Sequence, residues 1–556
     1  MMEKIWLKSY PAGVAAEVNV DEHQSLGELF DRSVAAFGQR AAFVNMDQAV
    51  TYRDLDRLSR NFGAYLQGGL NLQPGARVAL LMPNILQYPI ALFGVLRAGY
   101  TVVNCNPLYT PRELAHQLKD SGAEAIVIVE NSAWVLAEVI ADTEIKHVVT
   151  TQIGDMLAFP KNVFVNFIVK HVKRRVPAWL IPGAVSFRSA LKQGEALEWK
   201  PAKLGHDDIA FLQYTGGITG VPKGTMLTHG NVLANLQQAH AWMKPFFEEG
   251  REIIITALPL YHIFAITANC LIFLKIGATN VLITDPRNIA DFVKELGKHP
   301  FTAITGVNSL FNALLRHPDF GRVDFSRLRN CLAGGMALHR SVAERWRKIT
   351  GRTLIEAYGL TEASPGVTMN PFNLSQFNGS IGLPMPSTEV AIRDDQGRDL
   401  PIGQAGELCV RGPQIMKGYW RRPDETAKAI MPDGFLRTGD IAVMDEKGFI
   451  RIVDRKKDMI VVSGLKVYPN EVEDVVAMHP GVLDVGAVGV PDANSGEVVK
   501  IFVVKRDVNL TAEDLVAHCR KSLAGYKVPR QIEFRKELPK STIGKILRRV
   551  LREDAP

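Results

Sequence analysis

One segment of the chain combines the residue types that bind phosphate groups. Its sequence, YTGGITGVPKG over residues 214–224, holds four glycines, two threonines and one lysine. Glycine lets backbone N–H groups approach an anion closely, hydroxyl groups donate further hydrogen bonds, and lysine adds a positive charge. The segment is not a Walker loop, since Pro222 stands where that motif needs glycine. We predict a phosphate-binding loop, against the alternative of a tight glycine-rich turn between strands.

A second segment, EAYGLTEASP over residues 356–365, offers side chains for the rest of a nucleotide. Tyr358 can stack on a flat base, and Thr361 can reach a phosphate. Glu362 is a hard oxygen ligand suited to Mg²⁺. The alternative is an ordinary helix start, with threonine as the N-cap and an acid in the first turn.

Two segments near the C-terminal end contain further candidates. The turn RTGD carries Asp440, which can accept hydrogen bonds from both hydroxyls of a ribose, and Arg455 can pair with oxygens nearby. The alternative for this region is a β-hairpin with a charged turn. In LPKSTIGKILRR, residues 538–549, Lys545 follows a turn that would hold its stem in place. The alternative for Lys545 is one more cation on a solvated basic face.

These candidates need a scaffold, and the hydrophobic pattern predicts a parallel α/β one. Apolar residues at helical spacing alternate with short apolar runs before residue 130 and again from about 205 to 352. Such alternation indicates doubly wound α/β units. The first run predicts helices over 51–67, 85–99 and 110–122 and strands over 77–84, 101–106 and 123–129.

The pattern changes after residue 375, where short Gly- and Pro-containing strands predict a small β-rich subdomain. A compact α+β segment follows Arg455. The charge cluster DRKKD, residues 454–458, lies between two apolar strands and predicts a link between domains, with a solvated turn as the alternative. We predict an N-terminal domain over 1–454, including the β-rich subdomain at about 375–454, and a C-terminal domain over 455–556.

Composition excludes several classes of protein. The 556 residues are 47% hydrophobic and 22% charged, which is typical of globular proteins and unlike a disordered chain. The net charge of +7 is local, since residues 520–556 carry +7 and residues 161–175 carry +5. Two basic patches on a near-neutral body give no support to nucleic-acid binding. Five widely spaced cysteines, no secretory signal and no spanning segment predict a cytoplasmic protein without a disulfide framework or a zinc site.

The segment KNVFVNFIVKHVKRRVPAWLIP, residues 161–182, has the composition of an interfacial amphipathic helix. We predict a helix that can lie on the inner face of the cell membrane. The alternative is a surface helix that packs its apolar side on the core. The apolar face would hold Phe164, Phe167, Ile168, Val172, Val176 and Trp179, and the cations are Lys170, Lys173, Arg174 and Arg175.

Together, and in this order, the segments resemble the adenylate-forming superfamily of acyl-CoA synthetases, from about Ser25 to Arg552. Besides the segments above, ALPLYHIFA at 257–265 resembles its substrate-side segment, and CLAGGMALH at 331–339 its adenine-side strand. DRKKDMIVVSG resembles its interdomain hinge. The early segments MPNILQYPIALFGVLRAG and VNCNPLYTPREL are similar to bacterial long-chain fatty-acid–CoA ligases.

The resemblance implies a ligase that uses ATP and coenzyme A as co-substrates and Mg²⁺ as cofactor. A fatty-acid carboxylate would attack the α-phosphate of ATP, which forms acyl-AMP and releases pyrophosphate, and the coenzyme A thiol would then displace AMP. It also implies an α/β fold with a large adenylate-forming domain and a mobile α+β C-terminal domain that rotates between the two steps. A homodimer is implied by family analogy alone.

The resemblance further implies a role for each candidate residue. The catalytic residues would be Lys545, which would bridge the carboxylate and the α-phosphate, and His262, in a positioning role. Lys457 would be the hinge. The nucleotide-binding residues would be Thr215, Gly216, Gly217, Thr219, Gly220, Lys223, Gly334, Gly335, Tyr358, Gly359, Thr361, Asp440 and Arg455. The metal ligands would be Glu362 and Thr215, and the coenzyme A side would hold Ser463, Gly464 and Lys466.

One position departs from the family pattern. The family's loop usually has Ser or Thr directly after the Gly-Gly pair, where this chain has Ile218. A hydrogen bond to a charged group is worth about 1.5–3 kcal/mol, so we expect slower turnover or weaker ATP binding unless the loop compensates elsewhere. Two alternatives to the long-chain ligase stay open: another adenylating ligase, for a shorter or aromatic acid or with a carrier protein as acceptor, and a non-catalytic lipid- or nucleotide-binding homologue, which only Ile218 suggests.

Overall fold

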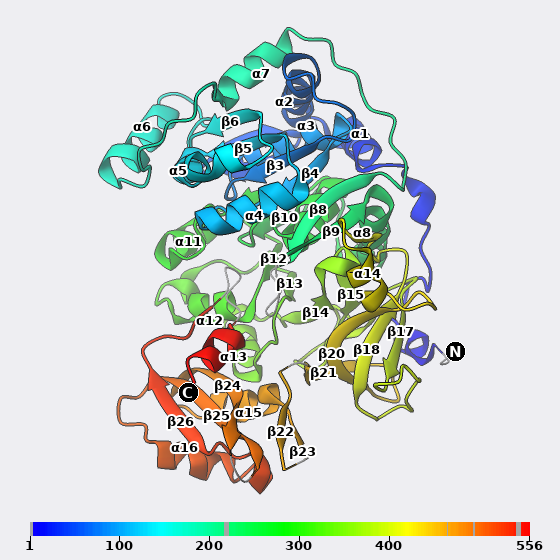
Figure 1. Ribbon diagram of the computed structural model, residues 1–556, viewed down its shortest axis with the longest axis vertical. Helices are drawn as coiled ribbons and strands as arrows, with labels where there is room; N and C mark the ends of the chain where they lie inside the picture. Colours follow the sequence, from blue (N-terminus) through cyan, green and yellow to red (C-terminus); the bar gives the residue numbers. More distant parts are fainter. Residues whose placement is uncertain are drawn as a thin grey trace.

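The computed structural model describes residues 4–215, 222–456, 458–463, 465–492, 495–540 and 546–555, with Lys466 described by its backbone only. Figure 1 shows an elongated molecule, with a large body that contains the N-terminal part of the chain and a smaller body at the C-terminal end. Within the described residues the strands form four sheets, two in the core of the large body, one beside them and one in the small body.

The first sheet of the large body has helices on both faces. Along β3, Val78 and Leu80 pack in one apolar cluster with helix α3, whereas Ala79 and Leu81 pack in another with α4 and α5. Successive strand residues point to opposite faces, so a strand buried on both sides is apolar throughout. The doubly wound arrangement predicted from the sequence is therefore confirmed.

The order of this eight-stranded sheet is β19-β9-β8-β4-β3-β5-β6-β7, with β3, β4, β5, β6 and β8 joined by parallel pairs. Its strands are β19 (Gly418–Tyr419), β9 (Lys223–Thr228), β8 (Ile209–Thr215), β4 (Thr101–Asn104), β3 (Arg77–Leu81), β5 (Ala125–Val129), β6 (His147–Thr151) and β7 (Val185–Ser186). Its helices include α2 (Tyr52–Ala64), α3 (Gln87–Arg97), α4 (Pro111–Ser121), α5 (Glu130–Val139) and α7 (Phe187–Glu195).

The elements predicted before residue 130 are confirmed, and local signals explain where they begin and end. Helix α4 starts at a capping box in which Thr110 and Glu113 satisfy each other's backbone N–H groups. It ends at Gly122, whose φ of +63° is the left-handed conformation of a helix C-cap. Helix α2 begins after Thr51, whose side chain accepts from the N–H of Asp54.

The second large sheet has nine strands and supplies part of the candidate site. Its order is β16-β15-β14-β13-β12-β10-β11-β1-β2, and β10 to β14 are joined in parallel. The strands are β16 (Leu383–Pro384), β15 (Gly366–Met369), β14 (Ile355–Gly359), β13 (Asn330–Ala333), β12 (Ala303–Gly306), β10 (Ile253–Thr256), β11 (Thr279–Leu282), β1 (Ala41–Asn45) and β2 (Gln48–Thr51). The helices that pack on it include α1 (Leu26–Phe37), α8 (His229–Met243), α11 (Ile289–Leu296), α12 (Asn308–Arg316) and α13 (Arg340–Thr350).

The β-rich region and the small body follow in the chain. A four-stranded antiparallel sheet is made of β17 (Glu389–Arg393), β18 (Gly406–Arg411), β20 (Leu436–Met444) and β21 (Ile450–Arg455), and α14 (Pro423–Ala429) lies between β19 and β20 in the chain. The small body holds β22 (Ile460–Val462), β23 (Leu465–Val467), β24 (Val482–Asp492), β25 (Gly496–Lys505) and β26 (Gln531–Arg535). Its helices are α15 (Pro469–Ala477), α16 (Ala512–Cys519) and α17 (Arg548–Glu553). An α+β composition of this region was predicted and is confirmed.

The prediction of one amphipathic helix over 161–182 is wrong in its length. The helix α6 (Lys161–Phe167) continues as a π-helical stretch over Ile168–Val172 and then stops, so Val176 and Trp179 are not on a helical face. Arg174 has a φ of +48°, a left-handed conformation that a continuing α-helix cannot contain. Within the described residues no helix combines the length and apolar character needed to cross a bilayer.

All five cysteines lie inside the protein. They have free thiols and are buried, and burial raises the pKa of each thiol. The prediction of a chain without disulfides agrees with this arrangement. The cysteines are Cys105, Cys270, Cys331, Cys409 and Cys519.

Candidate active site

The predicted phosphate loop connects two paired strands. Thr215, the last residue of β8, faces Lys223, the first residue of β9, in the antiparallel register. Helix α4 contacts the end of the loop, because Nε2 of His116 donates a hydrogen bond to the carbonyl oxygen of Pro222 at 3.0 Å. The loop positions between Thr215 and Pro222 lie outside the described residues: Gly216, Gly217, Ile218, Thr219, Gly220 and Val221.

Lys223 already has partners in the protein. Its ammonium forms an ion pair with the carboxylate of Glu425 in the first turn of α14. Its Nζ also lies 4.9 Å from the ring centroid of Tyr419, within the range of a cation–π contact. Glu425 pairs with Lys428 as well, at 2.8 Å, and hydrogen bonds from Lys223 and Lys428 lower the pKa of Glu425 to about 2. The carboxylate is therefore ionised at neutral pH.

Three predicted nucleotide-binding side chains are brought together from two sheets. The hydroxyl of Tyr358, on β14, donates to Oδ2 of Asp440 on β20 at 2.5 Å. Oδ1 of Asp440 pairs with Nε of Arg455 at 3.3 Å, and the two residues are opposite each other in the β20–β21 register. Burial, followed by the charge of Asp440, raises the pKa of Tyr358 well above its usual value, so the phenol stays a hydrogen-bond donor.

Three predicted glycines shape the space around this cluster. A Cβ on Gly334 would lie 3.1 Å from the ring of Phe264, in the predicted substrate-side segment. A Cβ on Gly359 would lie 2.1 Å from the carbonyl oxygen of Pro365, and Gly335 has a φ of +77°. A larger residue at Gly359 would have to displace backbone, one at Gly334 would push on the Phe264 ring, and the positive φ of Gly335 favours glycine by conformation.

Glu362 and Thr361 lie in a single 3₁₀ turn directly after β14. Oε1 of Glu362 accepts a hydrogen bond from the hydroxyl of Tyr419 at 2.8 Å. Tyr419 therefore connects the predicted metal ligand Glu362 with the predicted phosphate ligand Lys223. The carbonyl of Glu362 accepts from the N–H of Met416 at 2.8 Å, which joins this turn to the chain leading into β19.

The side chain of His262 is partly exposed to solvent, although protein atoms surround most of its ring. Its Nδ1 accepts a hydrogen bond from the N–H of Phe264 at 3.3 Å, so the ring caps the short helix that follows. Removal of water lowers the pKa of His262 to about 4, and the ring is therefore neutral at neutral pH. This fits a positioning residue better than a proton donor.

The small body holds the remaining candidates. Ser463 is exposed at the tip of the β22–β23 hairpin, and Figure 1 shows this hairpin at the lower end of the molecule, away from β14 and β20. The backbone of Lys466 pairs with Val461. Lys457, Gly464 and Lys545 lie outside the described residues. The predicted coenzyme A side and the nucleotide cluster are therefore apart in this arrangement.

One largely buried arginine, with a side chain 11% exposed, connects the C-terminal helix to the predicted hinge. Arg548 of α17 pairs with Glu473 on α15 at 2.6 Å and with Asp454 on β21 at 3.1 Å. Asp454 is fully buried, and burial raises its pKa to about 6, although the charge of Arg548 opposes that shift. The arginine fixes the start of α17, three residues after Lys545, against the end of the large body.

Sequence reasoning missed Tyr419, Glu425 and Arg548. Tyr419 and Glu425 occur in the segment GYWRRPDETAKAI, where an acid at a helix start is common and has no special meaning. Arg548 is one of many cations in the C-terminal region. Only the folding of distant segments onto one another gives these residues a connection to the site.

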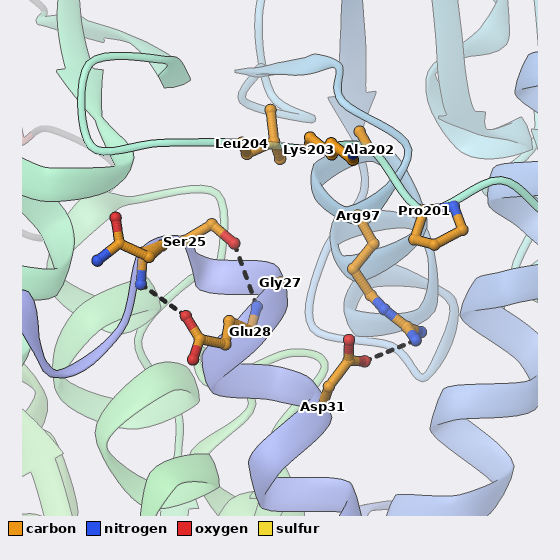
Figure 2. A pocket seen from close by; sticks show the side chains of 10 residues that line it. Ser25, Gly27, Glu28, Asp31, Arg97, Pro201, Ala202, Lys203 and Leu204 are labelled. Carbon is orange, nitrogen blue, oxygen red and sulfur yellow. Dashed lines mark hydrogen bonds and ion pairs between the residues drawn. The ribbon is translucent and has the colours of Figure 1, made fainter.

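A cavity of about 470 Å³ lies elsewhere in the large body, where the 201–204 segment passes the start of α1 (Figure 2). Arg97, which lines it, is already paired with Asp31 and Asp56, each at 2.8 Å. None of the predicted site residues lines this cavity. The candidate active site therefore remains the two groups of contacts described above, Tyr358 with Asp440 and Arg455, and Lys223 with Tyr419 and Glu362.

Comparison with known proteins relates almost the whole chain to one group of enzymes. Residues 30–420 match the AMP-binding enzyme family, and residues 471–545 match the AMP-binding enzyme C-terminal domain. A long-chain-fatty-acid–CoA ligase from Escherichia coli O6:H1 is 59% identical over 554 residues, which cover 100% of this chain and 99% of that relative. One from Haemophilus influenzae is 54% identical, again over 100% of this chain and 99% of the relative.

The fold agrees with these matches. The crystal structure of the anthranilate CoA ligase AuaEII in complex with anthranoyl-AMP superposes with a TM-score of 0.85, over 96% of this chain and 98% of that one, at 24% sequence identity. Identity this low concerns the fold alone. The family match over residues 30–420 and the full-length relatives carry the assignment: the chain belongs to the family of AMP-binding enzymes.

Proposed function

We propose that the protein is a long-chain fatty-acid–CoA ligase, which activates a fatty acid with ATP and transfers the acyl group to coenzyme A. The observation that carries this proposal is the agreement of relatives that match the chain from end to end, at 54–59% identity, in that one name. The residues of the candidate site have the chemistry that such a ligase needs.

In the first half-reaction the protein would hold ATP and the fatty-acid carboxylate in line. Asp440 would accept hydrogen bonds from the ribose hydroxyls, with Arg455 beside it, and Tyr358 would lie against the adenine. Lys223 and the hydroxyl of Thr215 would bind the phosphates that leave. Lys545 would contact the carboxylate and the α-phosphate, where negative charge increases during attack. Positioning and charge stabilisation are the main contributions a protein makes to such reactions.

Mg²⁺ fits the donor set near the phosphates. Among the described residues no cluster of three or more His, Cys, Asp or Glu could hold an ion alone. One carboxylate with a hydroxyl nevertheless suits Mg²⁺, which prefers few protein ligands together with substrate phosphates and water. We propose Glu362 and Thr215 as these ligands. When bound, the ion neutralises phosphate charge.

The second half-reaction needs another arrangement of the small body. We propose a hinge at 454–458 with Lys457 as pivot, domain limits of 1–454 and 455–556, and a rotation that brings Ser463, Gly464 and Lys466 to the site. Support comes from the end of β21 at Arg455 and from the remote position of the β22–β23 hairpin. His262 would position the acyl-adenylate. With a pKa of about 4 its ring carries no extra proton to donate at neutral pH, and we assign it no proton transfer.

The deciding experiment is a coenzyme A-dependent assay over fatty acids from short to long chains, together with pyrophosphate exchange for aromatic acids. A long-chain ligase gives acyl-CoA and AMP with the long chains. Exchange with a short or aromatic acid only, or exchange with no transfer to coenzyme A, would identify another adenylating enzyme. Absence of exchange with every acid would identify a non-catalytic homologue.

We also propose that residues 159–175 contact the cytoplasmic face of an anionic membrane. Val163, Phe164 and Phe167 are 56–65% exposed on α6, and Phe159 is 82% exposed beside it. Figure 1 shows α6 at the edge of the molecule. The adjacent cations Lys170, Lys173 and Arg174 form no ion pair within the described residues, and Arg175 has one at 3.5 Å, with Asp285. Exposed aromatic rings beside unpaired cations suit an anionic lipid surface.

Co-sedimentation with vesicles of phosphatidylglycerol and phosphatidylcholine tests this contact. Replacement of the four cations by glutamate should abolish binding, and Phe164→Ser with Phe167→Ser should weaken it, while neither change alters acyl-CoA formation from a soluble acid. Unchanged sedimentation of the charge-reversed protein would contradict the proposal.

A homodimer remains a proposal by family analogy, to be measured by sedimentation velocity.

A further inference from the structure

The ion pair between Lys223 and Glu425 has a consequence for nucleotide binding. Lys223 is the cation at the end of the proposed phosphate loop, and within the described residues its ammonium pairs with one carboxylate, that of Glu425. Both side chains are about one-third exposed, so the pair lies where a ligand from solvent can reach it. A carboxylate and a phosphate oxygen are both anionic acceptors for an ammonium group.

The position of Glu425 is fixed by its surroundings. Thr426, the next residue of α14, accepts a hydrogen bond from the N–H of Tyr419 at 2.9 Å, which holds α14 against β19. β19 is in turn paired with β9, the strand that begins at Lys223. Arg422, before α14, pairs with Asp120 of α4 at 2.7 Å. Paired strands and a helix, and not a flexible loop, therefore position the carboxylate of Glu425 beside Lys223.

Glu425 can release Lys223 at small cost. Its other oxygen accepts from Lys428, one turn along the same helix, at 2.8 Å. When Lys223 binds another anion, the carboxylate of Glu425 stays paired with Lys428 and exposed to water. Exposed ion pairs of this kind contribute little stability, so a ligand with several charges can replace one.

From this geometry we propose that Glu425 is a built-in competitor of the ATP β- and γ-phosphates for Lys223. The proposal rests on the proposed function, because it assumes that Lys223 contacts these phosphates. In the free protein Glu425 neutralises the lysine. ATP must displace it, and the negative carboxylate, which remains nearby, also repels the phosphates. After pyrophosphate has formed, Glu425 returns to Lys223 and opposes rebinding of the product.

The competition acts on the phosphate tail alone. AMP has no β- or γ-phosphate and would not contact Lys223, so Glu425 should leave AMP binding unchanged. The pKa of Glu425 is about 2, which keeps the competitor charged throughout the physiological range, and its removal requires a substitution rather than a change of pH.

The test is calorimetric titration of the full-length protein with α,β-methylene-ATP, which the enzyme cannot cleave, and with AMP. Glu425→Gln should tighten binding of the ATP analogue by roughly three- to tenfold, as expected for loss of one competing ion pair and its repulsion, and should leave AMP unchanged. Asp424→Asn is the matched control, since Asp424 adjoins Glu425 on α14 but forms no ion pair with Lys223 within the described residues.

The outcomes separate this proposal from the one on which it rests. Unchanged or weaker binding of the analogue by Glu425→Gln would overturn competition, and weaker binding would make Glu425 a residue that positions Lys223. An equal gain in affinity for the analogue by Asp424→Asn would also overturn the proposal, because loss of any negative charge on α14 would then have the same effect. Lys223→Gln tests the foundation: if it leaves analogue binding unchanged, the proposed phosphate role of Lys223 fails, whatever Glu425 does.

Discussion

The two sides of the candidate site differ in how ready they are for a ligand. On the nucleoside side, Tyr358 donates a hydrogen bond to Asp440 across two sheets, and Asp440 pairs with Arg455 on the adjacent strand of its own sheet. On the phosphate side, Lys223 is paired with Glu425, an acid that a ligand would have to replace. The first side is built from strands of two sheets, and the second from the first residue of β9 and the short helix α14.

This difference separates two sources of binding energy. Groups already oriented by the protein lose little freedom when a ligand arrives, so their hydrogen bonds contribute most of their strength to affinity. A cation that must exchange one anion for another contributes only the difference between the two. We therefore expect the nucleoside side to dominate affinity, and the phosphate side to dominate the rate of the chemical step, where Lys545 would act.

The largest expected effect concerns that step. Lys545→Ala should lower acyl-adenylate formation by at least about 100-fold, as for loss of one charge-stabilising contact in a transition state, and should change the affinity for ATP much less. Pyrophosphate release from ATP and fatty acid measures it. Lys536→Ala, a change to an exposed cation of the same region, is the control. Near-normal pyrophosphate release by Lys545→Ala would contradict the expectation that the phosphate side determines the rate of the chemical step.

The next effect concerns the nucleoside side. Asp440→Asn removes the charge that pairs with Arg455 and accepts from Tyr358, and it should weaken binding of ATP and AMP equally. Loss of hydrogen bonds to a charged group costs about 1.5–3 kcal/mol, or roughly 10–150-fold in the dissociation constant. Calorimetry with both nucleotides measures it, with the exposed Glu446→Gln as control. A loss for ATP but not for AMP would contradict the assignment of Asp440 to the ribose.

A smaller effect is expected at Ile218. Ile218→Thr supplies the hydroxyl that the family's loop usually has and should raise kcat/KM for ATP, by roughly tenfold if the added hydrogen bond has the lower value for a charged partner. Ile218→Val is the matched control, because it keeps the branched shape without the hydroxyl. An equal rise in both variants would show that shape, and not hydrogen bonding, limits the phosphate side.

The last prediction concerns the stability of the fold and not ligand binding, and it tests how the nucleoside side is supported. Glu356 lies on β14, two residues before Tyr358, and burial, followed by the charge of Asp474 on α15, raises its pKa to about 8. An acid with a raised folded pKa stabilises the fold fully below its unfolded pKa, near 4.5, and this contribution is lost as pH rises through 8. Each pKa unit corresponds to roughly 1.4 kcal/mol.

Glu356→Gln keeps the oxygen that accepts from the N–H of Leu338 and removes the titration. The Tm of the wild type should therefore fall by a few degrees relative to the variant between pH 5 and pH 8.5. Calorimetric scans across this range measure the difference, with the exposed Glu344→Gln as control. Parallel curves for wild type and Glu356→Gln would mean that Glu356 is charged in the fold and that the nucleoside side tolerates a buried charge.

The sequence could predict the elements near the site better than the contacts within it. Strands such as β3 and helices such as α4 follow from apolar spacing and from caps, which are local signals. The pairing of Asp440 with Arg455 was within reach, because both belong to one predicted hairpin region. The contact of Tyr358 with Asp440 was not, since it depends on how two sheets pack. The helix at 161–182 was overextended although Pro177 is a local signal against helix, and the left-handed conformation of Arg174 has no such signal of its own.

The burial of the cysteines has a consequence for an enzyme whose proposed acceptor is itself a thiol. Mixed disulfides form when a thiolate of either partner reaches a sulfur of the other, and this protein offers neither access nor ionisation, because its five thiols are buried with raised pKa values. Oxidised coenzyme A should therefore leave the protein unmodified. The same property makes the chain suitable for site-directed labelling, since a single cysteine introduced on the β22–β23 hairpin would react without background and test the proposed movement of the small body.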